Sequence, residues 1–261
     1  MKDTVGNRWF ICWRRAVAPR LRLFAFPYAG GGASVFRSWV PLLPDGIELF
    51  GFQPPGREGR FSEPVPTSLD DVVTAGERVI RELARDGVPF AFFGHSLGAL
   101  VAYSITCRME TASGVTPRHL IVSACVAPHR QTTVPDVHDL PDNDFIDWVQ
   151  GLGGTPPEVW ANAEMRELLL PILRADFRLV ASFRDDDCEP LQTPITALGG
   201  ESDHSVPHDA LAAWQERTRS ASAVYMLPGD HFFVHSTQGT VVERVLHVLG
   251  EPPSAGARPE R

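Results

Sequence analysis

The sequence predicts an α/β fold built on a mostly parallel sheet that helices cover on both faces. Short apolar segments typical of buried strands alternate with segments of helical periodicity, which favours parallel strands joined by helical crossovers. The 261 residues suffice for one α/β domain with a sizeable core. A content of 43% hydrophobic and 21% charged residues is ordinary for a globular protein. We therefore expect a single domain over residues 1–261.

Seven apolar segments supply the expected strands, and the first of them is expected at the edge of the sheet. They span residues 9–13, 21–26, 46–52, 88–93, 119–125, 194–199 and 221–227. A helix is expected from Ser68 to Arg85, because Ser68 and Asp71 resemble a capping box and apolar residues recur on one face. Further helices are expected from residue 99 onward, over 209–218 and over 239–249, followed by a disordered tail at 251–261.

The alternation of strands and helices stops between about residue 135 and residue 183, where no segment has the pattern of a strand. Asp142 is placed to begin one helix, and residues 162–183 continue with helical periodicity. A helical insertion of this length between two strands of an α/β sheet is typical of a lid over a pocket. The alternative is that these helices only thicken the core.

The segment Gly94-His95-Ser96-Leu97-Gly98 follows an apolar strand and precedes a helix rich in small residues. Glycines two residues before and after Ser96 fit a nucleophile elbow, a sharp strand-to-helix turn that exposes the serine hydroxyl. The alternative is a turn that only links the strand to the helix. We interpret Ser96 as the nucleophile of an α/β-hydrolase fold.

A second functional loop is predicted where the strand at 21–26 runs into Tyr28-Ala29-Gly30-Gly31-Gly32. It lacks the Lys-Ser/Thr pair of a phosphate-binding loop and the G-x-G-x-x-G spacing of a dinucleotide site. In α/β-hydrolases the oxyanion hole takes one N–H from such a loop and another from the residue after the nucleophile. We therefore expect the N–H groups of Leu97 and Ala29 to form the hole, with Tyr28 as the next choice for the second donor.

A serine hydroxyl needs a base to remove its proton, and the base needs an acid that fixes its tautomer. In this fold the acid and then the histidine follow late strands. Asp203 lies a few residues beyond the strand at 194–199, and His231 lies between the last strand and the last helix. We expect Asp203 and His231 to complete a catalytic triad with Ser96. Glu201 is the nearest rival acid.

Other polar residues near these positions receive different interpretations. Asp230 is adjacent to the histidine and is interpreted as loop-forming, and His95 is expected to pack beside the serine. Surface or cap positions are expected for the remaining histidines considered, His204, His208, His235 and His247. The run Asp185-Asp186-Asp187 is expected to be a solvated loop, and no histidine spacing supports a metal site.

Charge and composition limit the possible partners. A formal net charge of −8 does not suggest a nucleic-acid or anionic-membrane partner. The first residues lack the apolar region of a secretory signal, and no stretch is long and apolar enough for a membrane span, so we expect a cytoplasmic protein. The cysteines Cys12, Cys107, Cys125 and Cys188 show no C-x-x-C spacing. Cys107 and Cys125 are expected to be reduced core residues.

With these residues identified, the chain from Trp9 to about Val248 resembles the type II thioesterases, the editing enzymes that accompany polyketide synthases and non-ribosomal peptide synthetases. The resemblance includes the Leu152-Gly153-Gly154-Thr155-Pro156-Pro157 segment of the insertion. It is carried by the motifs Phe26-Pro27-Tyr28-Ala29-Gly30-Gly31-Gly32-Ala33, Pro55-Gly56-Arg57-Glu58, Gly94-His95-Ser96-Leu97-Gly98-Ala99, Pro194-Ile195-Thr196-Ala197 and Gly229-Asp230-His231-Phe232-Phe233. The acidic loop at 185–189 departs from the pattern expected of the family.

The resemblance implies a thioester hydrolase that uses Ser96, Asp203 and His231 through an acyl-enzyme. The implied substrate is an acyl group on the phosphopantetheine arm of an acyl or peptidyl carrier protein, with no cofactor of the enzyme itself. The implied role is to clear stalled or misprimed acyl groups, and we expect a monomer. Two alternatives stay open, namely an esterase or lipase acting on oxoesters and a non-catalytic module that binds carrier proteins. A cyclising terminal thioesterase is disfavoured because the chain stands alone.

Overall fold

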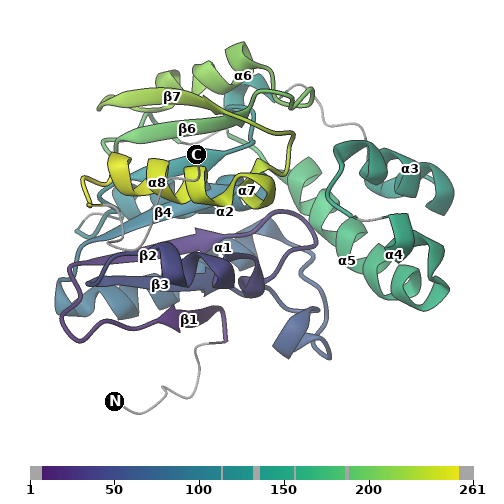
Figure 1. Ribbon diagram of the computed structural model, residues 1–261, viewed down its shortest axis with the longest axis horizontal. Coiled ribbons are helices and arrows are strands. Elements are labelled where there is room, and N and C mark those ends of the chain that lie inside the picture. The colour runs from purple at the N-terminus through teal and green to yellow at the C-terminus, as the bar shows by residue number, and fades with distance from the viewer. Residues whose placement is uncertain (1–7, 113, 132–135, 156, 186–187, 253–261) are drawn as a thin grey trace.

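The computed structural model describes residues 8–112, 114–131, 136–155, 157–185 and 188–252. Within these residues one seven-stranded sheet has the strand order β1-β3-β2-β4-β5-β6-β7 (Figure 1). Its strands are β1 (Phe10–Arg14), β2 (Leu21–Phe26), β3 (Ile47–Phe52), β4 (Phe90–His95), β5 (Leu120–Ser123), β6 (Ile195–Gly200) and β7 (Ser222–Leu227). Neighbouring strands are parallel except β1, which pairs antiparallel with β3 at the edge. The predicted mostly parallel α/β sheet, with its first strand at the edge, is confirmed.

Helices cover both faces of this sheet, and β2 shows why. Phe24 and Phe26 pack in a core with α1 and α2, whereas Leu23 and Ala25 pack in a second core with η1 and α8. A strand buried on both faces is mostly apolar, and β2 is apolar apart from Arg22 near its start. The covering helices are α1 (Leu69–Leu83), α2 (Leu97–Thr111), α6 (His208–Ala212), α7 (Phe233–Ser236), α8 (Gln238–Val248) and the 3₁₀ helix η1 (Ala33–Leu42).

Sequence patterns predicted most helix ends well, but they did not predict the 3₁₀ helix η1. The Ser68 hydroxyl caps α1 by accepting a hydrogen bond from the Asp71 N–H at 3.3 Å, as the capping pattern predicts. No helix was expected over η1, which buries Phe36 and Trp39 against the sheet. Its 3₁₀ geometry does not repeat with the 3.6-residue period that marks an α-helix.

The insertion forms a separate layer of helices at the end of the sheet where β2 and β4 finish, on the right in Figure 1. It contains α3 (Asp142–Leu152), α4 (Pro157–Ala161) and α5 (Ala163–Ser182). Its apolar residues form a core of their own, including Phe145, Trp160 and Leu173. This separate core argues against helices that only thicken the main core, and we call residues 136–183 the lid layer.

Different parts of the two chain termini lie within the described residues. The residues before Arg8, where no secretory signal was expected, lie outside the described part of the chain. Glu251, the first residue of the expected tail, instead pairs with Arg20 at 2.8 Å, while 253–261 are outside the described part.

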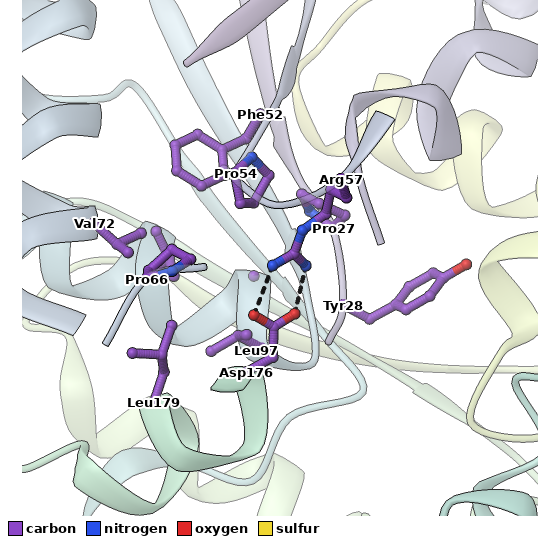
Figure 2. A pocket seen from close by; sticks show the side chains of 12 residues that line it. Pro27, Tyr28, Phe52, Pro54, Arg57, Pro66, Val72, Leu97, Asp176 and Leu179 are labelled. Carbon is purple, nitrogen blue, oxygen red and sulfur yellow. Dashed lines mark hydrogen bonds and ion pairs between the residues drawn. The ribbon is translucent and has the colours of Figure 1, made fainter. Parts of the chain in front are cut away.

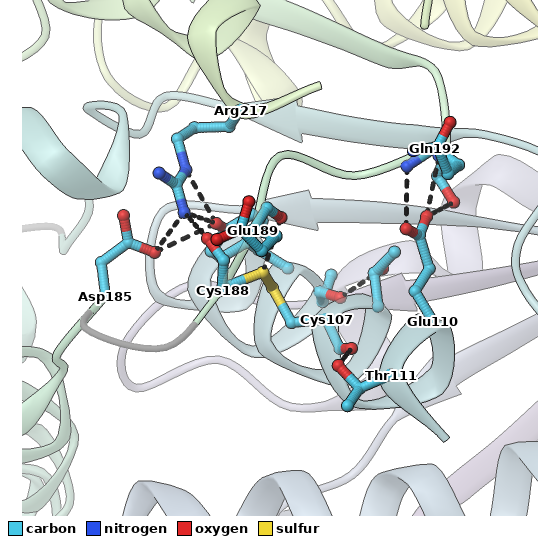
Figure 3. Close-up of a disulfide and its surroundings, with 12 residues drawn as sticks. Cys107, Glu110, Thr111, Asp185, Cys188, Glu189, Gln192 and Arg217 are labelled. Carbon is cyan, nitrogen blue, oxygen red and sulfur yellow. Dashed lines mark hydrogen bonds and ion pairs between the residues drawn. A yellow bond between two sulfur atoms is a disulfide. The ribbon is translucent and has the colours of Figure 1, made fainter. Parts of the chain in front are cut away.

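A disulfide joins Cys107 on α2 to Cys188, which follows the lid layer (Figure 3). The expectation that Cys107 is a reduced core residue was therefore wrong, whereas Cys125 is buried and free as expected.

Asp185, in the acidic run that was expected to be solvated, is not solvated. Its carboxylate accepts hydrogen bonds from Arg217 and Tyr103, each at 3.0 Å. Asp186 and Asp187 lie outside the described residues.

Replacing both Cys107 and Cys188 by serine should lower the free energy of unfolding by ~2–4 kcal/mol, because the bond links residues 81 positions apart and restricts the unfolded chain. Urea denaturation with and without dithiothreitol measures this. Reduction should shift the wild-type midpoint and that of the Cys12→Ser control, but not the midpoint of the double variant. A wild-type midpoint that is insensitive to the reductant would contradict the expectation.

Candidate active site

Ser96 lies at the junction of β4 and α2, in a backbone conformation that ordinary residues avoid. Its φ is 55° and its ψ is −119°. Such a conformation costs free energy and persists only where the surroundings impose it. The strand, sharp turn and helix predicted around Ser96 are all present.

The two flanking glycines permit this turn because neighbouring backbone fills the space that a side chain would need. A Cβ on Gly94 would lie 2.3 Å from the carbonyl oxygen of Gly98. A Cβ on Gly98 would lie 2.1 Å from the carbonyl oxygen of Phe26 at the end of β2. The elbow is therefore packed directly against the strand that leads into the glycine-rich loop.

Asp203 and His231, predicted from separate loops after β6 and β7, are in contact. The Nδ1 atom of His231 lies 2.7 Å from Oδ2 of Asp203, and both side chains are buried. Because an ionised carboxylate only accepts hydrogen bonds, Nδ1 carries a proton, and in the neutral ring the lone pair is therefore on Nε2. The imidazole is thus held in the tautomer that can accept a proton.

Ser205 completes this contact and was not identified from the sequence. Its hydroxyl donates to Oδ1 of Asp203 at 2.6 Å, and its backbone N–H donates to the same oxygen at 2.9 Å. The hydroxyl oxygen also lies 3.1 Å from Nδ1 of His231. The Asp-x-Ser spacing typical of an Asx turn is the signal that could have found it.

The environment keeps the Asp203 carboxylate ionised. Burial raises the pKa of Asp203, but the hydrogen bond and charge of His231, together with the hydrogen bonds from Ser205, outweigh burial and lower that pKa to about 2. A carboxylate that is ionised at neutral pH can stabilise an imidazolium beside it.

His95 links the elbow to the histidine loop. Its Nε2 lies 2.9 Å from the carbonyl oxygen of His231, and its Nδ1 lies 2.9 Å from the hydroxyl of Ser123. Burial, with a contribution from His231, lowers the pKa of His95 well below its ordinary value, so the ring is neutral. Nε2–H therefore donates to the carbonyl, and Nδ1 accepts from Ser123. His95 packs beside the serine, as expected, and connects it to the backbone of His231.

The rival residues lie apart from the Asp203–His231 contact. Glu201 is exposed, and it is Asp203 that bonds His231. The carboxylate of Asp230 accepts the N–H of Phe232 at 2.8 Å, the loop-forming role predicted for it. The histidines expected at the surface are all exposed, namely His204, His208, His235 and His247.

The loop expected to supply an oxyanion donor shares a small cavity with the elbow. This cavity of about 20 Å³ is lined by Pro27 and Tyr28 from the loop and by Leu97 and Gly98 from the elbow. Ala29 is half-buried beside it. The Tyr28 hydroxyl bonds Nε2 of His235 at 2.7 Å, which fixes one side of the loop. The two backbone segments predicted to form the oxyanion hole therefore meet.

The lid layer also contacts the histidine loop. A Cβ on Gly154 would lie 2.1 Å from the ring of Phe232, so the ring packs directly on this glycine. The centroid of the Phe232 ring is 5.2 Å from that of His231. The Gly153-Gly154 segment between α3 and α4 thus supports the residue that flanks the histidine.

Among the described residues, no group of three or more His, Cys, Asp or Glu side chains is arranged to hold a metal ion. Within the same part of the chain, none of the helices combines the length and the apolarity that crossing a bilayer requires.

A strained serine between a parallel strand and a helix, with a carboxylate–imidazole pair after the last two strands, places the protein in the α/β-hydrolase class. Residues 21–249 match the sequence model of the thioesterase domain, and the chain belongs to this thioesterase family.

Relatives and solved structures agree with this assignment. The gramicidin S biosynthesis protein GrsT of Aneurinibacillus migulanus is 42% identical over 237 residues, 91% of this chain and 92% of GrsT. The structure of BorB, the type II thioesterase from the borrelidin biosynthetic cluster, is similar with a TM-score of 0.83 and 30% identity, covering 92% of this chain and 97% of BorB. The RedJ thioesterase of the prodiginine pathway in Streptomyces coelicolor has a TM-score of 0.80 and 34% identity, covering 89% and 90%. The resemblance to type II thioesterases is confirmed, and the protein is a thioester hydrolase.

The pKa of Asp203 predicts a pH dependence of stability. Because that pKa falls from 3.8 to about 2 on folding, the unfolded chain takes up the proton first as the pH falls. Asp203 thereby contributes about 2 kcal/mol to the free energy of unfolding. This contribution is present above about pH 5 and is lost as the pH falls toward 2. Urea unfolding of Asp203→Asn between pH 3 and pH 7 should lack this part of the wild-type slope. Equal slopes in the two proteins would contradict the assignment.

Gly154→Ala should lower kcat/KM for acyl thioesters by up to ~10²-fold, because displacement of Phe232 shifts the neighbouring His231, and small misplacements are costly in catalysis. Gly151→Ala is the matched control, since its new Cβ would meet nothing within 4 Å. Steady-state kinetics of both variants measure the effect. Equal activity of the two variants would show that the lid layer does not support the histidine loop.

Proposed function

We propose that the protein removes acyl groups from the phosphopantetheine thioesters of acyl or peptidyl carrier proteins by a Ser96–His231–Asp203 mechanism. The observation that carries the mechanism is the 2.7 Å contact between His231 and Asp203, on the two loops that share a sheet edge with the strained Ser96. His95, the residue before Ser96, supports this arrangement because its side chain is hydrogen-bonded to the backbone carbonyl of His231.

In the first half-reaction, Nε2 of His231 accepts the Ser96 proton while the serine oxygen attacks the thioester carbonyl. The backbone N–H groups of Leu97 and Ala29 hold the oxyanion. The carbon–sulfur bond then breaks, and the imidazolium gives its proton to the leaving thiolate. Asp203 stabilises the imidazolium through Nδ1, and its low pKa suits this role.

In the second half-reaction, His231 activates a water that attacks the acyl-Ser96 ester. The products are a free acid and the regenerated hydroxyl. No step in this scheme uses a cofactor, and every residue in it comes from one chain, so we propose that a monomer acts. The membership in the type II thioesterases supports editing of stalled or misprimed acyl groups beside the carrier proteins, in the cytoplasm.

Ser96→Ala should lower hydrolysis of an acyl-carrier-protein thioester by several orders of magnitude, since the remaining groups supply only ~10³–10⁴-fold over water. Ser104→Ala, at a serine on the same helix, is the matched control and should keep wild-type activity. Mass spectrometry of the loaded carrier protein before and after incubation reports the loss of the acyl mass.

The same assay separates the alternatives. Faster turnover of a matched oxoester than of the thioester would favour an esterase or lipase. Turnover in Ser96→Ala equal to that of the wild type would favour a binding module without serine catalysis.

A further inference from the structure

We propose that Asp176, held by Arg57, is a positioning residue that fixes the oxyanion loop from the lid layer. The oxyanion loop is defined here as residues 28–31. This inference rests on the proposed function, because it assigns a structural support to one of the backbone donors named above.

Asp176 and Arg57 form a buried ion pair between α5 and the loop after β3. Two guanidinium nitrogens of Arg57 lie 2.5 and 2.9 Å from the two oxygens of Asp176 (Figure 2). Arg57 is 4% exposed and Asp176 is 2% exposed. Figure 2 shows the two side chains facing each other at the cavity that Tyr28 and Leu97 also line. Such a two-point contact fixes orientation as well as distance.

The carboxylate of Asp176 also holds the backbone of the oxyanion loop. Its Oδ2 accepts the N–H of Gly30 at 2.7 Å, and Arg57 donates to the carbonyl of Gly31 at 3.3 Å. Gly30 has a φ of 83°, and a Cβ there would lie 2.8 Å from Leu173 of α5. One face of α5 is therefore packed on this loop through both an apolar contact and a charged one.

These contacts lie on one side of Ala29, and the Tyr28–His235 hydrogen bond lies on the other. Ala29 thus lies between two anchored residues, Tyr28 through its side-chain hydroxyl and Gly30 through its backbone N–H. Anchoring at both ends orients the Ala29 N–H before any charge develops, which is what a preorganised donor requires. The contact at Gly30 comes from the lid layer, so a displacement of α5 would release one anchor.

Arg57 has a second effect at this position. An uncompensated carboxylate beside the hole would oppose the negative charge that develops on the substrate oxygen. The guanidinium pairs with both carboxylate oxygens and offsets that charge. The loop after β3 supports the arrangement further, because Glu58 accepts the Ser34 hydroxyl at 2.6 Å and Gln53 accepts the Ala33 N–H at 3.1 Å.

The test compares Asp176→Asn with Glu48→Gln. Glu48 pairs at 2.8 Å with the buried Arg22, which also pairs with Asp86, near the starts of β2 and β3, so both changes neutralise one member of a buried ion pair. The readouts are thioester kinetics and the rate at which a fluorophosphonate labels Ser96, a displacement of fluoride that needs the oxyanion hole but no thioester.

In Asp176→Asn, both the labelling rate and kcat should fall ~10–10²-fold, less than the ~10²–10³-fold of a deleted donor. KM should stay near the wild-type value, since the interaction is made in the transition state. In Glu48→Gln, labelling and kcat should match the wild type. Equal losses in the two variants, or none in either, would overturn the proposal.

The double variant Arg57→Met/Asp176→Leu covers the case in which Asp176→Asn fails to fold, because replacing both charges leaves no unpaired charge buried. It should fold and still label slowly, since leucine cannot accept the Gly30 N–H. Wild-type labelling by this variant would overturn the proposal.

A wild-type protein that labels but cleaves no thioester would contradict the proposed function alone, and the labelling rates would then decide the role of Asp176. A wild-type protein that does not label would overturn both.

Discussion

The close approach of α2 to the ends of β2 and β4 is the constraint on which the site depends. Gly98 lies so near the carbonyl of Phe26 that no side chain fits between them, and Gly94 lies equally near Gly98. This contact fixes where Ser96 projects, and it also fixes how far the loop after β2 lies from the start of α2. The proposed mechanism requires the nucleophile and the two backbone donors to agree to within a fraction of an ångström, and direct backbone packing provides that agreement better than flexible side chains do.

Features encoded locally were predictable from the sequence. Buried parallel strands are mostly apolar, so β2 and β4 were located within about two residues, although β2 contains Arg22 and β4 ends in His95. The elbow was predictable because its glycine spacing reflects a steric requirement of a few adjacent residues. The positions of Asp203 and His231 beyond the last two strands were predictable because chain order and strand ends constrain them in this fold. Their mutual contact was then a consequence of neighbouring parallel strands, β6 and β7.

Features that depend on pairs of distant residues were not predictable. Cys107 pairs with Cys188 across 81 positions, and nothing near Cys107 distinguishes a bonded half-cystine from an apolar core thiol. Arg57 and Asp176 are 119 positions apart, and each alone resembles an ordinary charged residue. The packing of Gly154 on Phe232 requires knowing how the lid layer sits. For the same reason, the solvated loop expected at Asp185 proved to be paired with Arg217.

The lid layer touches both halves of the site, at Phe232 beside the histidine and at Gly30 beside the expected oxyanion donor. The cavity beside the oxyanion loop, about 20 Å³, has room for about one water molecule, so a larger group would fit there only with movement of its lining. The nature of the second contact is suited to such movement. A buried ion pair orients its partners strongly but contributes little net stability, because hydration of the separated charges offsets the lost attraction. Separating Arg57 from Asp176 can therefore cost less free energy than separating an apolar contact that orients its partners equally well. When the ion pair forms again, it restores the same loop position.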